Sequence, residues 1–509
     1  MLILTAGQTR AEEERGVRSG ISYEKMMRFA GGNAAELLMR EYPDANRIVV
    51  VCGRGRNGGD GFVAAQRFRA ENKKVYIILA DGSPTDELSK RMYERTRVAG
   101  ILAYDFTKSP DSCRATMNAC DLLVDAVFGV GFRGAMRPGT AALAEIYNTV
   151  NAPKAALDIP SGLCADSGAL PGLWFRADCT VTMHAKKPVH ALAPASAACG
   201  KVLVADIGFA PEPEEIFAYE TDARFVADSL PTRRADANKG DFGFALSVCG
   251  SRNMPGAAII AARAAVESGA GLVGAAFPDA AYGAMTAQLC EPVFIPCASC
   301  EDGGFSAEAV NALSARLSSA DAALFGCGVG KGEGAAEVLR YLIKNTFQPL
   351  IIDADGINLL AENIDLLKER SAPTLLTPHP GEMSRLTGLT AAEINADRVG
   401  NARKFAAKYG VNLLLKGRGT VIASPLGELF INPTGNPGMA TGGSGDMLSG
   451  LILSFAAQGM PLFEAAVSGA YVHGAAGDLA ARAYSMAGTT PLRMLRMLPR
   501  VLSQIEKKK

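Results

Sequence analysis

Hydrophobic and polar positions in the first 210 residues follow two alternating patterns. Nearly continuous apolar runs, RIVVVC (47–52), KVYIILA (74–80) and DLLVDAVFG (121–129), predict buried strands. Longer stretches with helical spacing lie between them, for example DGFVAAQRFRAENK (60–73). Strands that alternate with helices predict a parallel, doubly wound sheet, and ligands bind such sheets at the carboxyl ends of the strands.

A segment of different composition interrupts this alternation. Residues 208–231 are rich in Pro and Glu and have no clear period, so we place a domain boundary near residue 215. The alternation then restarts, with strands predicted in 242–251, 349–358 and 374–382.

The last part of the chain departs from the strict alternation. Three strands close together, NLLLKG, GTVIASP and GELFINP, are expected to be partly antiparallel, and residues 445–506 read as helical. We therefore predict two α/β domains, residues 1–215 with a Rossmann-like doubly wound sheet and residues 222–509.

Composition narrows the class of protein. A chain of 509 residues is too long for one domain with a single core. Lys+Arg and Asp+Glu are equal at 52 each, and this charge balance does not indicate a nucleic-acid or membrane partner. The N-terminal apolar segment is too short for a signal peptide, and no stretch approaches the roughly 20 apolar residues of a membrane span. Eleven scattered cysteines suit a reducing compartment. We expect a cytoplasmic protein that acts on small molecules.

The stretch NPGMATGGSGDMLSG (436–450) places glycines directly ahead of an apolar run. A helix N-terminus offers unpaired N–H groups, and glycines let an anion approach them, which predicts a phosphate site at Gly442, Gly443 and Gly445. Asp446 would repel that anion unless it had a chemical task, so we interpret it as a general base. The alternative is a tight loop that leads into a helix.

Three predicted strand ends in the first half carry polar, Gly-rich sequences. They are GRGRNGGDG (53–61), DAVFGVGFRG (125–134) and DIPSGL (158–163). Strand ends of one parallel sheet meet at one edge, which favours a pocket over three unrelated turns.

Oxygen-bearing side chains in these three loops suggest a cation site. Asn57, Asp125 and Ser161 offer the oxygen ligands that hard cations prefer. Because only one of the three is a carboxylate, a monovalent ion is favoured over Mg²⁺.

Residues 1–215 resemble the N-terminal domain of the bifunctional NAD(P)H-hydrate repair enzymes, the YjeF-type epimerase. The family's loop usually reads G-x-G-N-N-G-G-D-G, so Arg56 stands where the first Asn is expected and Asn57 is the second. The resemblance implies that Asn57, Asp125 and Ser161 surround a potassium ion.

The same resemblance implies a set of contacts to the hydrated nicotinamide nucleotide. The residues are Arg56, Asn57, Gly58, Gly59, Asp60, Gly129, Val130, Gly131, Phe132, Arg133, Gly134, Ala135 and Asp158. Asp158 is the acid/base candidate for epimerisation, against the alternative that it only caps the turn before Pro160. Arg56 leaves one substrate contact open, although an Arg can also bind a pyrophosphate.

The C-terminal half resembles ribokinase-like proteins, and more narrowly the ADP- or ATP-dependent NAD(P)H-hydrate dehydratases. The matching stretches are CGSRNMPGAAIIAARAA (249–265), GCGVG (326–330), DADGIN (353–358), TPHPGEMSRL (377–386), KGRGT (416–420) and NPGMATGGSGDMLSG. They occur in the family order. One departure is GCGVG, where the family more often has G-P-G-L-G, so Cys327 replaces a Pro.

This resemblance assigns roles to individual residues. Ala257, Gly328, His379 and Asp446 are expected to contact the hydrated nucleotide, with Asp446 as catalytic base. The adenine nucleotide is expected to contact Lys416, Gly417, Arg418, Gly419, Thr420 and Gly445. His379 has an alternative, structural role in a rigid loop between two prolines. Asp353 and Asp355 are candidates to hold Mg²⁺ or phosphate, with turn residues as the alternative.

Together the two resemblances imply a repair enzyme for hydrated nicotinamide cofactors. The N-terminal half would interconvert R- and S-NAD(P)HX, and the C-terminal half would dehydrate the S form to NAD(P)H while ADP is converted to AMP and phosphate. K⁺, ADP and Mg²⁺ are the expected cofactors and co-substrate, and we expect a homo-oligomer. The alternative is a small-molecule kinase fused to a non-catalytic nucleotide-binding module.

Overall fold

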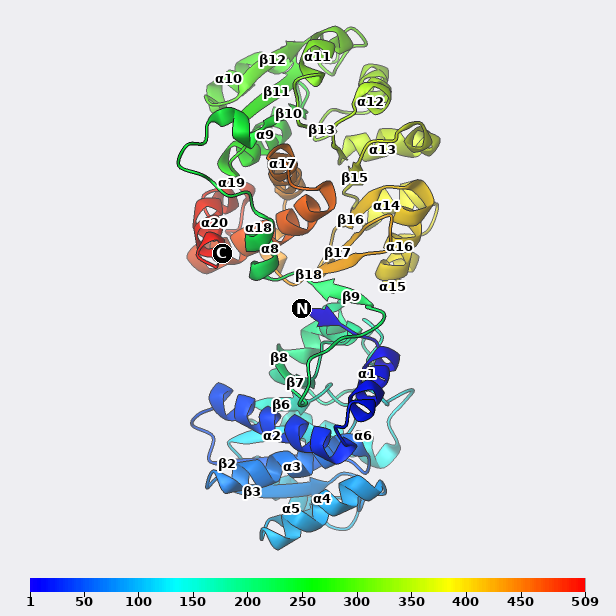
Figure 1. Cartoon of the computed structure of the whole chain (residues 1–509), viewed down its shortest axis with the longest axis vertical. Helices are drawn as coiled ribbons and strands as arrows, with labels where there is room; N and C mark the ends of the chain where they lie inside the picture. The colour runs from blue at the N-terminus through cyan, green and yellow to red at the C-terminus, as the bar shows by residue number, and fades with distance from the viewer. Residues whose placement is uncertain (509) are drawn as a thin grey trace. The chain divides into compact units, whose positions relative to one another are not determined.

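The computed structural model describes residues 1–508, and the chain divides into two compact units. The first unit is Met1–Tyr219 and the second begins at Glu220. Both contain a sheet flanked by helices (Figure 1). No helix within residues 1–508 combines the length and the apolar character that crossing a membrane requires.

The sheet of the first unit is parallel throughout, in the order β4-β3-β2-β5-β6-β7-β8. Its strands are β2 (Arg47–Cys52), β3 (Lys74–Leu79), β4 (Leu102–Asp105), β5 (Leu122–Ala126), β6 (Lys154–Leu157), β7 (Cys179–Met183) and β8 (Lys201–Ala205). Apolar runs in the sequence predicted β2, β3 and β5, and the runs KAALDIPSG (154–162), ADCTVTMHA (177–185) and KVLVADIGF (201–209) predict β6, β7 and β8. The edge strand β4 was not predicted, because LAYD is short and none of its residues is fully buried.

Helices cover both faces of this sheet. They are α1 (Ala6–Arg18), α2 (Tyr23–Glu41), α3 (Arg56–Ala70), α4 (Glu87–Val98), α5 (Pro110–Asn118), α6 (Pro138–Thr149) and α7 (Pro188–Ala191). Along β2, Ile48 and Val50 pack with α2, α3 and α4, whereas Val49 and Val51 pack with α5 and α6. Successive residues of one strand thus enter different cores, which confirms the doubly wound sheet.

The sheet of the second unit runs in the order β18-β17-β16-β15-β14-β13-β10-β11-β12. Its strands are β10 (Phe244–Val248), β11 (Leu272–Pro278), β12 (Val293–Cys297), β13 (Ala322–Phe325), β14 (Leu350–Ile352), β15 (Thr374–Leu376), β16 (Asn412–Leu415), β17 (Thr420–Ala423) and β18 (Leu429–Asn432). The pairs β16–β17 and β17–β18 are antiparallel and the remaining pairs are parallel, as predicted.

The helices of the second unit form two layers. They are α8 (Ala223–Ser229), α9 (Pro255–Glu267), α10 (Tyr282–Gln288), α11 (Ala309–Leu317), α12 (Glu333–Asn345), α13 (Asp355–Glu362), α14 (Pro380–Thr387), α15 (Ala391–Ala396), α16 (Arg398–Tyr409), α17 (Ser444–Ala457), α18 (Leu462–Tyr484), α19 (Pro491–Leu495) and α20 (Leu498–Glu506). Figure 1 shows α9, α17 and α18 on one side of the strands and α12 to α16 on the other. A Cβ on Gly450 of α17 would lie 2.1 Å from the Ala261 carbonyl oxygen, so glycine permits the close α17–α9 packing.

The boundary segment is more ordered than its composition indicates. Strand β9 (Ala218–Glu220) pairs antiparallel with β1 (Leu2–Ile3), and α8 follows with Asp222 as its N-cap. Elements of three and seven residues are too short to show a period in the sequence.

Candidate functional sites

A cavity of about 790 Å³ opens at the carboxyl ends of β2, β5 and β6 in the first unit. Predicted site residues that line it are Arg56, Asn57, Asp60, Gly129, Val130, Gly131, Phe132, Arg133, Ala135 and Asp158. The three Gly-rich strand ends therefore meet at one cavity, as the sequence predicted.

Three residues predicted to contact the substrate, Gly58, Gly59 and Gly134, do not line this cavity. A Cβ on Gly58 would lie 2.0 Å from the carbonyl oxygen of Gly53, and one on Gly59 would lie 2.6 Å from the Met27 side chain. Gly58 and Gly59 therefore allow close packing at the start of α3. Contact with substrate through their backbone N–H groups stays a prediction.

The predicted cation ligands surround the ends of β5 and β6. The buried Asp125 accepts hydrogen bonds from the Ser161 hydroxyl at 2.7 Å and the Ser161 amide at 2.7 Å. Burial raises the pKa of Asp125 to about 7. Asn57 donates through Nδ2 to the Leu157 carbonyl oxygen at 3.3 Å, while its buried Oδ1 has no partner among the described residues. An unpartnered buried oxygen beside this group fits a cation.

Asp158 bonds to side chains and loops beyond its own turn. Its Oδ1 accepts from Lys187 Nζ at 2.7 Å, and its Oδ2 accepts from the Val130 amide at 3.0 Å. Burial disfavours the charge, but Lys187 outweighs burial and lowers the pKa of Asp158. The backbone at Asp158 has a φ of +66°, which is costly for a residue with a side chain. Asp158 is therefore held as a carboxylate at the cavity wall.

Lys187 is a cavity residue that the sequence analysis missed. It is fully buried, and its ammonium also donates to Thr182 Oγ1 at 2.8 Å and the Met183 carbonyl oxygen at 2.9 Å. His190 helps to hold the backbone around this pair. Burial lowers the pKa of His190 to about 3. Its Nδ1 accepts a hydrogen bond from the Lys187 amide, and its Nε2 donates one to the Asp158 carbonyl oxygen. The available signal was the run HAKKP directly after strand β7 of the same sheet.

Helix α1 also contributes residues that the sequence analysis missed. Thr9, Arg10 and Glu13 line the cavity, and a Cβ on Gly131 would lie 4.0 Å from Arg10 Nη2. The guanidinium of Arg10 therefore reaches the loop after β5. Helical spacing places these side chains on one face of α1, but sequence alone does not reveal that this face meets the cavity.

Arg56, the departure from the family loop, lies at the cavity mouth. Its guanidinium is 4.7 Å from the ring centroid of Tyr23, and its Nη1 is 3.9 Å from Glu13 Oε2. Burial, followed by the Asp158 charge, raises the pKa of Glu13. Arg56 therefore supplies positive charge without displacing Asn57.

The second unit has a cavity of about 920 Å³ beside the start of α17. All six residues predicted for the adenine nucleotide line it, namely Lys416, Gly417, Arg418, Gly419, Thr420 and Gly445. His379 lines it as well, and so does His473, which was not predicted and whose Nε2 lies 3.2 Å from Ser444 Oγ.

The glycines ahead of α17 permit a left-handed backbone conformation and leave the space in front of the helix N-terminus open. Gly443, the N-cap, has a φ of +88° and offers no side-chain cap to the first N–H groups of the helix. A Cβ on Gly442 would meet no atom within 4 Å. The geometry therefore leaves the helix N-terminus accessible, which suits the predicted phosphate site.

Asp446 lies in the first turn of α17. Burial, followed by the neighbouring Asp353 carboxylate, raises the pKa of Asp446 to about 6. A carboxyl with this pKa is largely ionised at neutral pH and can accept a proton. Asp446, Ala257 and Gly328 do not line the 920 Å³ cavity. A Cβ on Gly328 would lie 2.9 Å from that of Ala257, so these two predicted substrate residues adjoin each other.

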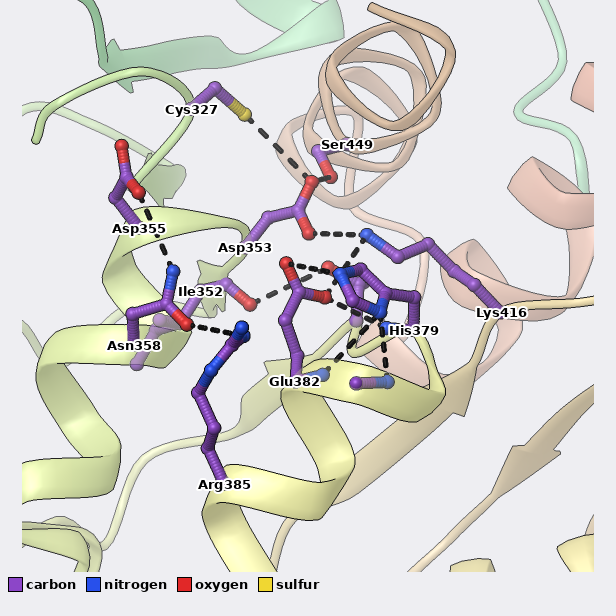
Figure 2. Close-up of polar contacts among 12 residues, drawn as sticks. Cys327, Ile352, Asp353, Asp355, Asn358, His379, Glu382, Arg385, Lys416 and Ser449 are labelled. Carbon is purple, nitrogen blue, oxygen red and sulfur yellow. Dashed lines mark hydrogen bonds and ion pairs between the residues drawn. The ribbon is translucent and has the colours of Figure 1, made fainter. Parts of the chain in front are cut away.

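Charged side chains beside the cavity form a connected group around Asp353 and Lys416 (Figure 2). Lys416 Nζ lies 2.8 Å from Asp353 Oδ1 and 3.6 Å from Glu382 Oε2, and Ser449 Oγ donates to Asp353 Oδ2 at 2.8 Å. Burial disfavours the charge of Asp353, but Lys416 outweighs burial and lowers its pKa. The same pairing, against burial, raises the pKa of Lys416.

The hydrogen-bond partners of Asp355 differ from those of Asp353. It accepts from the Gly330 amide at 3.0 Å and from Asn358 Nδ2 at 3.4 Å (Figure 2). The two carboxylates are therefore not a ready pair for one ion. A different group could hold a metal: Cys327, Asp353 and Asp446 each place one ligand atom within 4.8 Å of the others.

His379 caps a helix and faces the cavity. It is the N-cap of α14, its Nδ1 accepts from the Gly381 amide at 2.9 Å, and its Nε2 lies 3.5 Å from Glu382 Oε1. The side chain is 51% exposed. These contacts fix the loop, in agreement with the alternative, structural role of His379. The exposed edge of the ring can still contact a ligand.

Comparison with known proteins covers both halves of the chain. A family model described as NAD(P)H-hydrate dehydratase matches residues 245–500, and one described as YjeF-related protein N-terminus matches residues 23–189. The chain is similar to the bifunctional NAD(P)H-hydrate repair enzyme Nnr of Moorella thermoacetica, with 37% identity over 94% of this chain and 92% of that protein. The protein of the same name from Escherichia coli K12 is 32% identical over 97% of this chain and 92% of that protein.

A solved structure matches a large part of the chain. A ribokinase-like superfamily protein from Enterococcus faecalis V583 is 28% identical, with a TM-score of 0.50, over 58% of this chain and 99% of that one. The likeness confirms the ribokinase-like fold predicted for the C-terminal half.

Proposed function

The chain belongs to the bifunctional NAD(P)H-hydrate repair enzymes, and on this premise we propose that it repairs hydrated NADH and NADPH with two separate active sites. Residues 1–215 would epimerise R- and S-NAD(P)HX. Residues 222–509 would dehydrate the S form while ADP is converted to AMP and phosphate. The observation that carries the proposal is Asp446, a carboxyl with a pKa of about 6 at an open helix N-terminus beside a nucleotide-sized cavity.

We propose the following course for the dehydration. Asp446 takes the proton of the substrate hydroxyl while that oxygen attacks the terminal phosphoryl group of ADP, and AMP leaves. The N–H groups at the start of α17 and the Lys416 ammonium stabilise the negative charge. Phosphate then departs from the ring carbon, driven by the ring nitrogen's lone pair, and loss of a ring proton restores NAD(P)H.

Mg²⁺ fits this site as a companion of the nucleotide. Mg²⁺ keeps several waters and binds through one or two carboxylates plus substrate phosphates, and it would neutralise phosphate charge. Asp446 must stay free to act as the base, and Asp353 is bonded to Lys416 and Ser449, so we propose that the nucleotide phosphates and water supply most of the Mg²⁺ ligands. Asp353 would therefore serve mainly to hold Lys416.

For the first unit we propose that Asp158 and Lys187 handle protons during epimerisation. The two groups are 2.7 Å apart at the cavity wall, so one proton can pass between a ring hydroxyl and the pair. K⁺ would be held by Asn57, Asp125 and Ser161 and would supply positive charge beneath the nucleotide; the unpartnered Asn57 Oδ1 supports this.

Substrate phosphates have partners in the first cavity. Arg133 pairs with Asp166 and Arg137 pairs with Asp81, whereas Arg10 and Arg54 have no ion-pair partner within residues 1–508. We propose that these two guanidinium groups and the start of α3 hold the pyrophosphate of the substrate.

We further propose a cytoplasmic homo-oligomer that acts on small molecules and needs neither nucleic acid nor membrane. All eleven cysteines are free, which suits a reducing compartment. Light scattering after size-exclusion chromatography measures the oligomeric state.

One coupled assay tests the proposal. The purified protein is mixed with an epimer mixture of NADHX and either ADP or ATP, and NADH formation is followed by absorbance. We expect complete conversion with ADP. A stable phosphorylated product without NADH would indicate a small-molecule kinase. Conversion that stops once one epimer is consumed would contradict the proposed epimerase activity.

Separate fragments test the assignment of activities to residues. Because β9 pairs with β1, the first fragment should extend to residue 221 rather than 215. We expect it to epimerise alone, and residues 222–509 to dehydrate one epimer only. The assignment fails if soluble fragments carry the opposite activities.

A further inference from the structure

Three potential ligand atoms, one of them from the proposed catalytic base, lie close together. Cys327 Sγ lies 3.9 Å from Asp353 Oδ2, and these two residues and Asp446 offer ligand atoms within 4.8 Å of one another. In a tetrahedral zinc site, bonds of about 2.3 Å to sulfur and about 2.1 Å to oxygen place such ligand atoms about 3.6 Å apart. Small side-chain adjustments would therefore let these three residues bind the ion, with water as the fourth ligand.

The thiol changes which cation this group prefers. Two carboxylates alone suit hard ions such as Mg²⁺, whereas a thiolate selects softer ions such as Zn²⁺ or Co²⁺. Cys327 occupies a position where the family pattern more often has Pro, which offers no ligand atom. Cys327 also contacts the thiol of Cys249, a second soft donor at the end of β10.

We propose that Cys327, Asp353 and Asp446 form a site for a borderline-soft divalent cation of the Zn²⁺ class, and that an ion bound there blocks dehydration by occupying Asp446. The inhibition rests on the proposed function of Asp446, whereas cation binding itself does not. Binding releases the thiol proton to solvent as the S–metal bond forms.

Lys416 is compatible with this site. Its ammonium bonds to Oδ1 of Asp353, while the thiol approaches Oδ2 (Figure 2). Ser449 donates to the same Oδ2, but a carboxylate oxygen has two lone pairs and can accept a second bond. One thiolate and two carboxylates offset the charges of a divalent cation and the Lys416 ammonium, so these five groups together carry no net charge.

The first experiment measures binding without activity. The full-length protein is titrated with Co²⁺ alone, and the absorption of a sulfur-to-cobalt bond is recorded. We expect this absorption in the wild-type protein and at least a tenfold smaller signal in Cys327→Ser, with Cys290→Ser, an exposed cysteine far along the chain, as the matched control. An equal signal in wild type and Cys327→Ser, or none in either, would overturn the proposal.

The second experiment measures inhibition, with the epimerase of the same chain as internal control. We expect Zn²⁺ to reduce dehydration at least tenfold and a chelator to restore it, while epimerisation is unchanged. Cys327→Ser should need at least tenfold more Zn²⁺, and Cys327→Pro, which restores the family residue, repeats the test if the serine variant folds poorly. Loss that a chelator does not reverse would indicate thiol oxidation and contradict the proposal. If no dehydration occurs even without Zn²⁺, the proposed function fails, and the Co²⁺ titration still decides the cation site.

Discussion

The two proposed catalytic carboxylates, Asp158 and Asp446, have opposite electrostatic environments. Asp158 is bonded to the ammonium of Lys187 at 2.7 Å, and this partner outweighs burial and lowers its pKa. Asp446 is also largely enclosed, but the neighbouring charge that affects it most is the carboxylate of Asp353, and burial together with this charge raises its pKa to about 6. Burial raises the pKa of both carboxyl groups, so the charge of the neighbouring residues decides whether the net shift is downward or upward.

Under the proposed function, one fold class would supply two kinds of chemistry. A carboxylate held ionised by an ammonium is a fixed charge and a relay for protons. A carboxyl with a pKa near neutrality is a base that can be reprotonated in each cycle. In the second unit a lysine is also present, but Lys416 bonds to Asp353 instead of Asp446.

The largest expected effect comes from removing the base. Asp446→Asn keeps the shape but cannot accept a proton, so dehydration should fall about 10²–10⁴-fold, or roughly 3–5 kcal/mol. Single-turnover NADH formation measures the rate, and calorimetry should show ADP binding unchanged or tighter. Epimerisation in the same preparation is the control. Retention of more than about a tenth of the rate would contradict the role of Asp446.

The next effect comes from breaking the pair in the first unit. Lys187→Met leaves the buried Asp158 without its cationic partner, which should cost about 3–5 kcal/mol of unfolding free energy at pH 7 and most of the epimerisation. In the wild-type protein, the pair contributes its full stabilisation of the folded state above the pKa that Asp has in the unfolded chain. This stabilisation is lost as the pH falls through the lower pKa of Asp158 in the folded state. In the variant, Asp158 becomes neutral at higher pH, so the difference in stability should shrink between pH 7 and 5.

A double variant controls for simple cavity effects. Lys187→Met with Asp158→Asn removes the unpaired charge and should recover part of the lost stability in a denaturant titration. Additive losses would indicate that the pair is not coupled.

A smaller effect separates the two activities. Asp125→Ala removes the only carboxylate of the proposed K⁺ site, and epimerisation should fall by about 10–100-fold or more, with K⁺ no longer stimulating it. Dehydration of the S epimer should persist. Parallel loss of both activities would indicate misfolding rather than loss of an ion.

The parts of this picture that were predictable from sequence are the local ones. Strands β2, β3 and β5 follow from apolar runs, and the cavity at their ends follows from glycine loops in a parallel sheet. The edge strand β4 escaped prediction because a partly exposed edge does not require a continuous apolar run.

Long-range partners were not predictable. Lys187 reaches Asp158 across 29 positions, and Arg10 reaches the loop after β5 from a helix at the start of the chain. Nothing in their local sequence specifies these contacts. Gly58 and Gly59 show the reverse case: the motif indicated ligand contact, whereas the structure also gives them a packing role.

The most direct test of the account is the pH dependence of dehydration, measured as kcat/KM. We predict that the rate rises with pH through a midpoint near 6, because Asp446 must be ionised to act as base. A phosphate of the nucleotide can titrate near pH 6 as well. Asp355→Asn separates the two, because the Asp355 charge contributes to the raised pKa of Asp446. We predict that this variant moves the midpoint to lower pH, whereas an unchanged midpoint, or a rate that is flat from pH 5 to 8, would contradict the role of Asp446 as base.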